Sequence, residues 1–391
     1  MSSPTHRQAV SNAALVIGIL LIAANLRAPF TGLPPLLGPI QTEFGLSTLA
    51  TGALTTLPLL AFALLSPFSA LLAREYGLER ALFGALAAIA LGIALRSAGA
   101  VWCLYAGTGI LGMGIAVGNV LLPSLVKRDF PHHIASITGA YALAMGVAAA
   151  LGSAAAIPLA HAWGWRSALL AFLVLPVGAL AIWMTQLGGR STPVADTATP
   201  PHGGKVWHSA LAWQVTLFLG LNSTIYYVVI GWLPTILTDA GMSPTQAGSL
   251  HGVLQLATAI PGLLLGPILR RLRDQRLAAG LASMFSAIAL TGFWAMPQLS
   301  FVWSILFGVG TGAGIILGLS FIGLRSGNAR QAATLSGMSQ CVGYLLASVG
   351  PMAIGAIHDA LGGWTVSLIL CAGLAVVATL MGILAGRNRR L

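Results

Sequence analysis

A single arginine stands in the middle of an otherwise apolar stretch near the start of the chain. Arg27 is the only Lys, Arg, Asp or Glu residue between Asn12 and Gln41. A fixed cation at that depth in a membrane span costs about 3 kcal/mol on insertion scales, so such residues usually face a bundle interior or a wet cavity. Its guanidinium presents a flat fork of donors suited to a carboxylate or a similar small anion. Arg27 therefore indicates a path for an anion, and the alternative is a structural arginine neutralised by backbone carbonyls or helix ends.

Polar side chains spaced four residues apart share one helix face and provide further candidate contacts. Amides and phenols can donate hydrogen bonds to an anion, while the aromatic rings exclude water. Together with Arg27, the predicted substrate-binding residues are Asn25, Asn119, Tyr141, Asn222, Tyr226, Tyr227, Gln340 and Tyr344. The alternative role for each of them is hydrogen bonding between helices, without a ligand.

A histidine and a glutamine provide a candidate gate or proton-coupling pair. His251 and Gln255 are four residues apart, and His251 is the only side chain in the body of a predicted span that titrates near physiological pH. It lies about one turn inside the outer face, which favours a simple gate or a packed polar residue over a proton carrier. No Asp or Glu falls inside a predicted span, so we expect uniport, exchange, or a proton carried by a weakly acidic substrate or by His251.

The composition identifies an integral membrane protein. Of the 391 residues, 57% are hydrophobic and only 7% are charged, whereas a soluble chain carries about 25% charged residues. Cys103, Cys341 and Cys371 all fall in apolar segments without paired spacing, so neither a disulfide framework nor a metal motif is predicted. The lipid bilayer is the expected environment, and no cofactor is expected.

Twelve stretches are long and apolar enough to cross a bilayer, for which about 20 helical residues suffice. They are 13–37, 48–72, 80–98, 101–125, 134–157, 166–187, 210–237, 246–269, 278–297, 300–323, 332–356 and 363–386. A linker at 188–208, rich in Gly, Pro, Thr and Ser, divides them six and six. We therefore expect an all-α membrane protein with twelve transmembrane helices in two pseudo-symmetric six-helix bundles, at 1–187 and 209–391.

The basic residues predict the orientation in the membrane. If the N-terminus is cytoplasmic, all of the 19 Lys and Arg residues except Arg27, Arg96 and Arg166 fall on the cytoplasmic side. Cytoplasmic loops of membrane proteins carry such an excess of basic residues. This explains the net charge of +11 without a nucleic-acid partner. The expected location is the inner (cytoplasmic) membrane, with both termini in the cytoplasm.

The two halves of the chain form an internal repeat. A shift of 196 residues places Gly112, Gly114 and Gly118 on Gly308, Gly310 and Gly314. Two parallel repeats of six spans are typical of transporters that hold substrate midway between two rocking halves. Small residues let transmembrane helices pack closely, with or without transport.

Three segments carry a resemblance to a known family. They read Asn25-Leu-Arg-Ala-Pro29, Gly114-Ile-Ala-Val-Gly-Asn-Val-Leu-Leu-Pro123 and Gly337-Met-Ser-Gln-Cys-Val-Gly-Tyr344. With two six-span halves, the chain resembles the major facilitator superfamily, and within it the cyanate and 2-nitroimidazole transporter family. In that family Asn-Leu-Arg is usually followed directly by Pro, whereas here Ala28 intervenes. The resemblance implies a cytoplasmic-membrane transporter for a small compound, with members ranging from cyanate uptake to nitroimidazole export.

The connection after the second span departs from the superfamily pattern. Residues 70–77 sit where the superfamily carries Gly-x-x-x-Asp-Arg-x-Gly, but alanine replaces the first glycine and Arg74-Glu75 reverses the acid–base order. A charge network that clamps the cytoplasmic side can survive this exchange. Arg74 and Glu75 are therefore predicted gating residues.

The leading prediction is a secondary transporter for a small anionic or weakly acidic compound, such as cyanate or a small carboxylate. It works by alternating access, with Arg27 binding the anion, and a monomer is expected. The alternative is an exporter of neutral or cationic drug-like compounds such as nitroimidazoles, with Arg27 structural. A membrane enzyme needs a metal cluster, a nucleophile–base pair or paired carboxylates, and the His132-His133 pair is the nearest approach. A channel fits the repeated architecture less well than a rocking transporter does.

Overall fold

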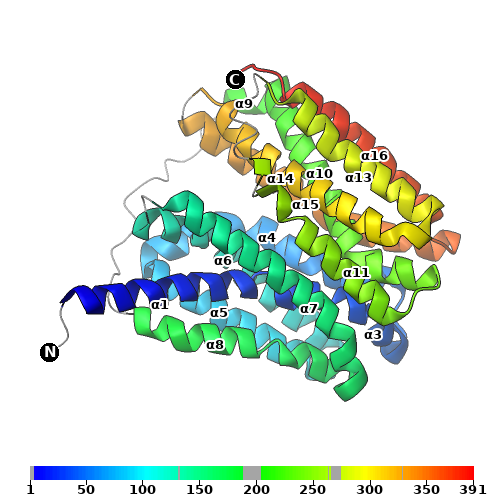
Figure 1. Cartoon of the computed structure of the whole chain (residues 1–391), viewed down its shortest axis with the longest axis horizontal. Coiled ribbons are helices and arrows are strands. Elements are labelled where there is room, and N and C mark those ends of the chain that lie inside the picture. The colour runs from blue at the N-terminus through cyan, green and yellow to red at the C-terminus, as the bar shows by residue number, and fades with distance from the viewer. Residues whose placement is uncertain (1–3, 131–132, 188–203, 263, 266–273, 328) are drawn as a thin grey trace. The chain divides into compact units, whose positions relative to one another are not determined.

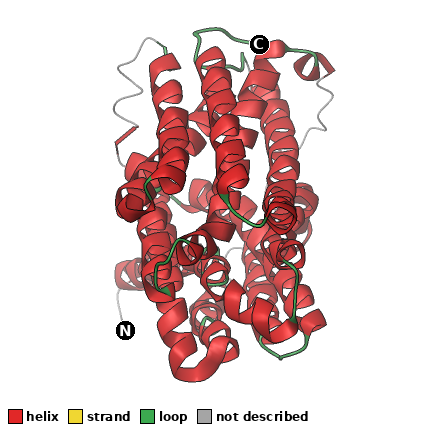
Figure 2. Cartoon of the chain, turned by 90° about the vertical axis from the view of Figure 1, so that its right-hand side faces the viewer, coloured by secondary structure: helices red, strands yellow, loops and turns green. Residues whose placement is uncertain are grey.

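The computed structural model describes residues 4–130, 133–187, 204–262, 264–265, 274–327 and 329–391. Within these ranges all regular structure is helical, and no strand occurs (Figure 2). Only helices and closed barrels can cross a bilayer, because each backbone polar group must be paired inside the protein. The predicted all-α fold is confirmed.

The helices follow one another closely along the chain (Figure 1). The first half contains α1 (Pro4–Asn25), α2 (Ala28–Thr31), the 3-10 helix η1 (Pro34–Leu36), α3 (Leu37–Phe44), α4 (Thr48–Tyr76), α5 (Leu78–Arg96), α6 (Val101–Asp129), α7 (Ile134–Ala171), α8 (Val174–Trp183) and η2 (Met184–Gln186). The second half contains α9 (Gly204–Trp207), α10 (Ala210–Asp239), α11 (Pro244–Ala257), α13 (Arg276–Ala295), η3 (Pro297–Leu299), α14 (Ser300–Leu324), α15 (Ala329–Leu361) and α16 (Thr365–Ala385).

Ten helical stretches of the described chain are long and apolar enough to span a membrane. One of them, Gly139–Gln186, has 48 residues, or about 72 Å of helix, which is far more than one crossing requires. Its path breaks at Gly164, whose φ of 79° is not helical, so this stretch supplies two predicted spans. The predicted span 246–269 begins in α11, which has 14 residues, and continues into residues outside the described ranges.

Two compact units divide the chain, and each is described by itself. One comprises Met1–Leu33 and Leu64–Thr197, and the other Pro34–Ala63 and Ala198–Leu391. Residues from the first half of the sequence therefore contribute to the second unit. The predicted bundle limits stay a prediction, and the predicted linker lies mostly outside the described residues, except that its last part includes α9.

The two units repeat a close contact between helices at a glycine. A Cβ added at Gly118 of α6 would lie 2.5 Å from Cδ2 of Leu26. In the second unit, a Cβ at Gly314 of α14 would lie 2.3 Å from Oδ1 of Asn222 in α10. The partners are related by the same 196-residue shift as the glycines. The sequence repeat is therefore also a repeat of packing contacts.

A second pair of contacts lies at positions that the repeat also relates, with the two glycines 198 residues apart. A Cβ at Gly152 of α7 would lie 2.9 Å from the carbonyl oxygen of Ala28, and one at Gly350 of α15 would lie 3.0 Å from Cγ2 of Thr224. Thr224 is 196 residues after Ala28. These contacts align the interrupted segment after α1 with the continuous helix α10.

Candidate functional site

The first span is interrupted where the sequence places Arg27. Helix α1 ends at Asn25, Arg27 has φ −126° and ψ −53°, and the short helix α2 begins at Ala28. Pro29 has no N–H to donate to the carbonyl of Asn25, which breaks the helical ladder at this turn. The N–H groups of Phe30 and Thr31 instead bond to the carbonyl of Arg27, at 3.0 and 2.9 Å. The motif Asn25-Leu-Arg-Ala-Pro29 thus forms a bend in the backbone.

The second repeat has no such interruption. Helix α10 runs for 30 residues through the positions equivalent to the bend, and Ser223 is the residue that corresponds to Arg27. Glycines at equivalent positions make close contacts in both units, although with different partner atoms, so the difference in helix path is local to this segment. The bend is therefore a feature of the first repeat alone.

A buried arginine of α5 binds the bend. Arg96 is 1% exposed and donates from Nη1 to the carbonyl oxygen of Pro29 at 2.8 Å. Its Nε and Nη2 have no hydrogen-bond partner among the described residues. The equivalent position in the second repeat is Gly292, so this arginine, like the bend, belongs to the first half alone. The sequence reasoning placed Arg96 near the outer face and missed this role.

Helix α7 fixes the bend from another side. The hydroxyl of Thr31 lies 2.9 Å from the carbonyl oxygen of Ala149, to which it donates a hydrogen bond. A Cβ on Gly32 would lie 2.4 Å from the ring of Phe172, so the backbone is in close contact there. Threonine, glycine and the buried arginine together hold the irregular segment in one conformation.

Arg27 and Asn25 differ in their surroundings. The side chain of Arg27 is half-buried. Asn25 is fully buried, and its amide donates to the carbonyl of Leu21 at 2.8 Å, one turn earlier in the same helix. The Oδ1 atom of Asn25 has no hydrogen-bond partner among the described residues, which leaves one acceptor two residues before Arg27 in the sequence.

The remaining predicted residues of the first unit lie on separate helices. Asn119 on α6 and Tyr141 on α7 are both half-buried. Glu75, at the end of α4, is exposed, and the side chain of Arg74 lies outside the description. Their predicted roles in binding and gating stay predictions.

In the second unit, the amide of Asn222 contributes to helix packing. Its Nδ2 donates to the carbonyl of Thr311 in α14 at 3.1 Å, and its Oδ1 faces Gly314. This is the interhelical hydrogen bond that the sequence left open as the alternative to ligand binding. Asn222 is also the repeat equivalent of Leu26, the residue before Arg27.

Two contacts in the second unit join residues from the predicted set. The hydroxyl of Tyr226 donates to Oε1 of Gln255 at 3.0 Å, and its ring packs against Tyr227 with centroids 5.2 Å apart. His251 lies fully buried one turn before Gln255. The Tyr226–Gln255 contact connects a predicted binding residue on α10 to a predicted gating residue on α11.

Part of the hydrogen-bonding capacity on the polar face of α15 is used within the same helix. The amide of Gln340 donates to the hydroxyl of Ser336 at 2.9 Å. The ring of Tyr344 makes an edge contact with Phe62, with centroids 5.6 Å apart. Both tyrosine and phenylalanine belong to the second unit, because residues 34–63 are part of it.

The backbone of residues 34–63 also lies close to the backbone of α15. A Cβ at Gly52 would lie 3.0 Å from the carbonyl oxygen of Pro351, and one at Gly355 would lie 2.9 Å from that of Thr48. The carboxylate of Asp359 accepts a hydrogen bond from the N–H of Leu49 at 3.0 Å. It thereby caps the first turn of α4, where unpaired N–H groups attract negative charge.

An ion pair that the sequence reasoning missed joins α5 to α6. Arg128 donates to the carboxylate of Glu79, which is 4% exposed, and from Nε to Oδ1 of Asp129 at 2.9 Å. Burial lowers the pKa of Arg128, but hydrogen bonds and charges from Asp129 and Glu79 outweigh this effect and raise the pKa above its usual value.

The second unit repeats this pair with a neutral acceptor. Arg325 donates to the side chain of Gln275, which is 196 residues after Glu79. Arg325 also donates to the carbonyls of Ala385 and Gly386, at 2.8 and 3.1 Å. Burial lowers its pKa, and the charge of Asp274 partly opposes this. The signal available in the sequence was the spacing of Glu79 and Gln275 by the repeat length.

The described residues include no group of three or more His, Cys, Asp or Glu side chains placed to hold a metal ion. The three cysteines are free, with Cys103 and Cys371 buried and Cys341 exposed. Of the histidine pair considered for an enzyme, His132 lies outside the described residues and His133 is exposed.

Comparison with known proteins places the chain in a family. The model of the Major Facilitator Superfamily matches residues 15–351. The chain is 51% identical to the 2-nitroimidazole transporter of Escherichia coli (strain K12), over 100% of both proteins. It is 26% identical to the cyanate transport protein CynX of the same organism, over 93% of this chain and 96% of that one.

Among solved structures, the fold is similar to a bacterial homologue of the human lysosomal transporter Spinster, crystallised in an inward-facing and unoccupied conformation. The TM-score is 0.78 with 16% identity, covering 99% of this chain and 98% of that chain. The resemblance inferred from the sequence motifs is confirmed. The chain belongs to the Major Facilitator Superfamily and is a multi-pass membrane transporter, not an enzyme.

Proposed function

We propose that the chain transports a small planar compound whose oxygen atoms or negative charge bind Arg27. The observation that carries this proposal is the bend at Arg27, which is present in one repeat only and is held by Arg96 and α7. A bend of this kind opens backbone groups and aims a side chain, and intramembrane arginines mark substrate paths. The buried Asn25 beside it adds an acceptor for an N–H group of the substrate.

Two substrate classes fit this chemistry. A nitro group and a carboxylate both present two coplanar oxygens, which match two N–H groups of a guanidinium. The full-length relative named for 2-nitroimidazole supports the nitroimidazole class. The more distant relative named for cyanate supports the small anions. In this proposal Arg27 also binds the nitro group of a nitroimidazole. The sequence-based alternative, an exporter of nitroimidazoles, gave Arg27 a structural role instead.

The transport step in this proposal is alternating access by a monomer in the inner membrane, with both termini in the cytoplasm. The positive charge of the loops supports that orientation. Opening towards the outer face requires residues 34–63 to separate from α15, where Gly52 and Gly355 permit close contact and Asp359 caps α4. This contact is a candidate for the outer gate.

The proposal is tested by transport in proteoliposomes. Uptake of labelled 2-nitroimidazole, cyanate and benzoate is compared for the wild type, Arg27→Gln and the control Arg166→Gln, which removes an exposed arginine of α7. Saturable uptake that is lost in Arg27→Gln and kept in Arg166→Gln is the expected result. Equal uptake by wild type and Arg27→Gln would make Arg27 structural and overturn the proposal.

A further inference from the structure

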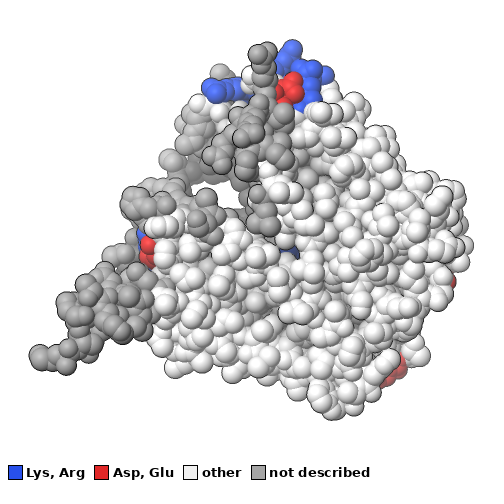
Figure 3. Space-filling model, in the orientation of Figure 1, with Lys and Arg blue, Asp and Glu red and all other residues white. Residues whose placement is uncertain are grey.

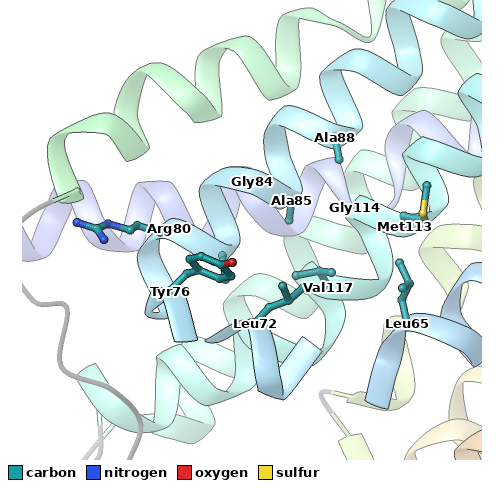
Figure 4. A pocket seen from close by; sticks show the side chains of 11 residues that line it. Leu65, Leu72, Tyr76, Arg80, Gly84, Ala85, Ala88, Met113, Gly114 and Val117 are labelled. Atoms are coloured by element: carbon teal, nitrogen blue, oxygen red, sulfur yellow. The ribbon is translucent and has the colours of Figure 1, made fainter. Parts of the chain in front are cut away.

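A groove opens on the surface of the first unit between α4, α5 and α6 (Figure 4). Its volume is about 330 Å³. Leu72, Tyr76 and Met113 are exposed at its rim, and its lining is mainly apolar. Large apolar side chains exposed on a transmembrane bundle face hydrocarbon, so this hollow is expected to contain lipid rather than water.

One face of α5 forms the floor of the groove. Arg80, Gly84 and Ala88 are each four residues apart and therefore share that face. A Cβ at Gly84 would meet nothing within 4 Å, so the glycine leaves space above the helix. From Arg80 to Ala88 the helix rises about 12 Å, so the floor of the groove follows α5 over about that length.

The groove is charged at one end only. Arg80 lies in the first turn of α5, is exposed, and is on the predicted cytoplasmic side. Along the rest of its length the groove is lined by leucine, alanine, glycine, valine and methionine. Tyr76, which is 57% exposed, lies beside the charged end with an amphipathic ring suited to the membrane interface. Figure 3 shows that charged side chains are few on the face it presents.

We propose that this groove binds an anionic phospholipid of the cytoplasmic leaflet. Its phosphate pairs with Arg80, and one acyl chain lies over Gly84 and Ala88. Basic pockets between transmembrane helices on the cytoplasmic side bind anionic head groups in this manner, and the guanidinium pairs with phosphate oxygens through two N–H groups. The site is separate from the bend at Arg27 and does not depend on the identity of the transported compound.

The test is native mass spectrometry of the purified, delipidated full-length protein. Phosphatidylglycerol and phosphatidylcholine with identical acyl chains are titrated separately. The wild type is expected to bind phosphatidylglycerol more tightly, and Arg80→Gln is expected to weaken it about tenfold, as for one charge-assisted contact. Gly84→Leu fills the groove and is expected to abolish the binding of that lipid.

Two matched variants serve as controls. Arg276→Gln removes an exposed arginine at the repeat equivalent of Arg80, and Gly178→Leu adds the same side chain at an exposed glycine of α8 with open space around it. Both are expected to bind phosphatidylglycerol as the wild type does. Equal affinity for the two lipids, an equal loss in Arg276→Gln, or unchanged binding in Gly84→Leu would each overturn the proposal. Displacement of the lipid by 2-nitroimidazole would also overturn it, because the groove would then be a substrate site.

Discussion

Arg96 donates a hydrogen bond to the carbonyl oxygen of Pro29, and so connects a fully buried cation to the bend that carries Arg27. The repeat equivalent of Arg96 is Gly292, and the helix equivalent to the bend is continuous. The arginine and the bend therefore occur together in one half and are both missing from the other. We interpret Arg96 as a positioning residue for Arg27.

Replacing Arg96 by methionine tests this relationship. We expect Arg96→Met to keep the fold, because removing a buried cation with unpartnered N–H groups is often neutral or stabilising. Substrate affinity is expected to fall at least tenfold, because the Pro29 carbonyl loses its donor and the bend relaxes. In an Arg27→Gln background the same substitution is expected to have no further effect on affinity. An independent loss in the double variant, measured by equilibrium binding, would contradict the positioning role.

The glycines beside the bend differ in what an added methyl group would meet. At Gly152 it meets the backbone oxygen of Ala28 at 2.9 Å, whereas at Gly118 it meets the end of the flexible Leu26 side chain. We expect Gly152→Ala to lose about 1–3 kcal/mol of stability through overpacking, and Gly118→Ala to lose less. Gly139→Ala, where the space is open, is the control. The order is checked by thermal unfolding in detergent, and a larger loss at Gly118 than at Gly152 would be the opposite of what the packing predicts.

Two arginine contacts predict a tolerated exchange: Arg128 with Glu79 in the first turn of α5, and Arg325 with Gln275 at the N-cap of α13. Glu79→Gln reproduces the acceptor that Gln275 provides to Arg325 in the second unit. We expect it to leave the melting temperature nearly unchanged, whereas Glu79→Ala should cost about 1.5–3 kcal/mol, as for a lost hydrogen bond to a charged group. Equal destabilisation by Gln and Ala would show that the charge, and not the acceptor, matters.

The Asp359 carboxylate at the first turn of α4 predicts how accessible α4 is from the outer face. Removing the carboxylate in Asp359→Ala takes about 1 kcal/mol from the contact between α4 and α15, which is roughly a fivefold change in the population of the closed state. The readout is labelling of Thr55→Cys by a membrane-impermeant maleimide, in a chain from which the three native cysteines have been removed. Thr55 of α4 is buried against Gly231 of α10, so labelling is expected to be slow without Asp359→Ala and several-fold faster with it. An unchanged labelling rate would show that this contact is not an outer gate.

Hydropathy predicted the architecture well, because the bilayer restricts what an apolar chain can form. Ten apolar helical stretches, one of them double, correspond to most of the predicted spans. The repeat was visible in the glycine spacing, and the structure shows its physical basis in the contacts of Gly118 and Gly314. Pro29 accounts for the break that the structure shows after Asn25.

The polar residues were harder to interpret from spacing. A polar stripe at four-residue intervals looks the same whether it faces a ligand, a neighbouring helix or its own backbone. Asn222 bonds to the backbone of α14, and Gln340 bonds to Ser336 within α15. Arg96 and Glu79 were missed because their partners are distant in the sequence: Pro29 is 67 residues away and Arg128 is 49. Hydropathy also places charged residues at span ends towards water, whereas these two are buried.

The most direct test of the account is equilibrium binding of two ligands to wild type and Arg27→Gln. The ligands are 2-nitroimidazole and 2-chloroimidazole, which keeps the ring and an electron-withdrawing substituent but lacks the two oxygens. If Arg27 binds the nitro group, the substitution should weaken the binding of 2-nitroimidazole by roughly 10-fold to 100-fold, as expected for a hydrogen bond to a charged group. The affinity for 2-chloroimidazole should change by less than about twofold. Equal weakening of both ligands, or of neither, would contradict the central claim that Arg27 holds the substrate oxygens.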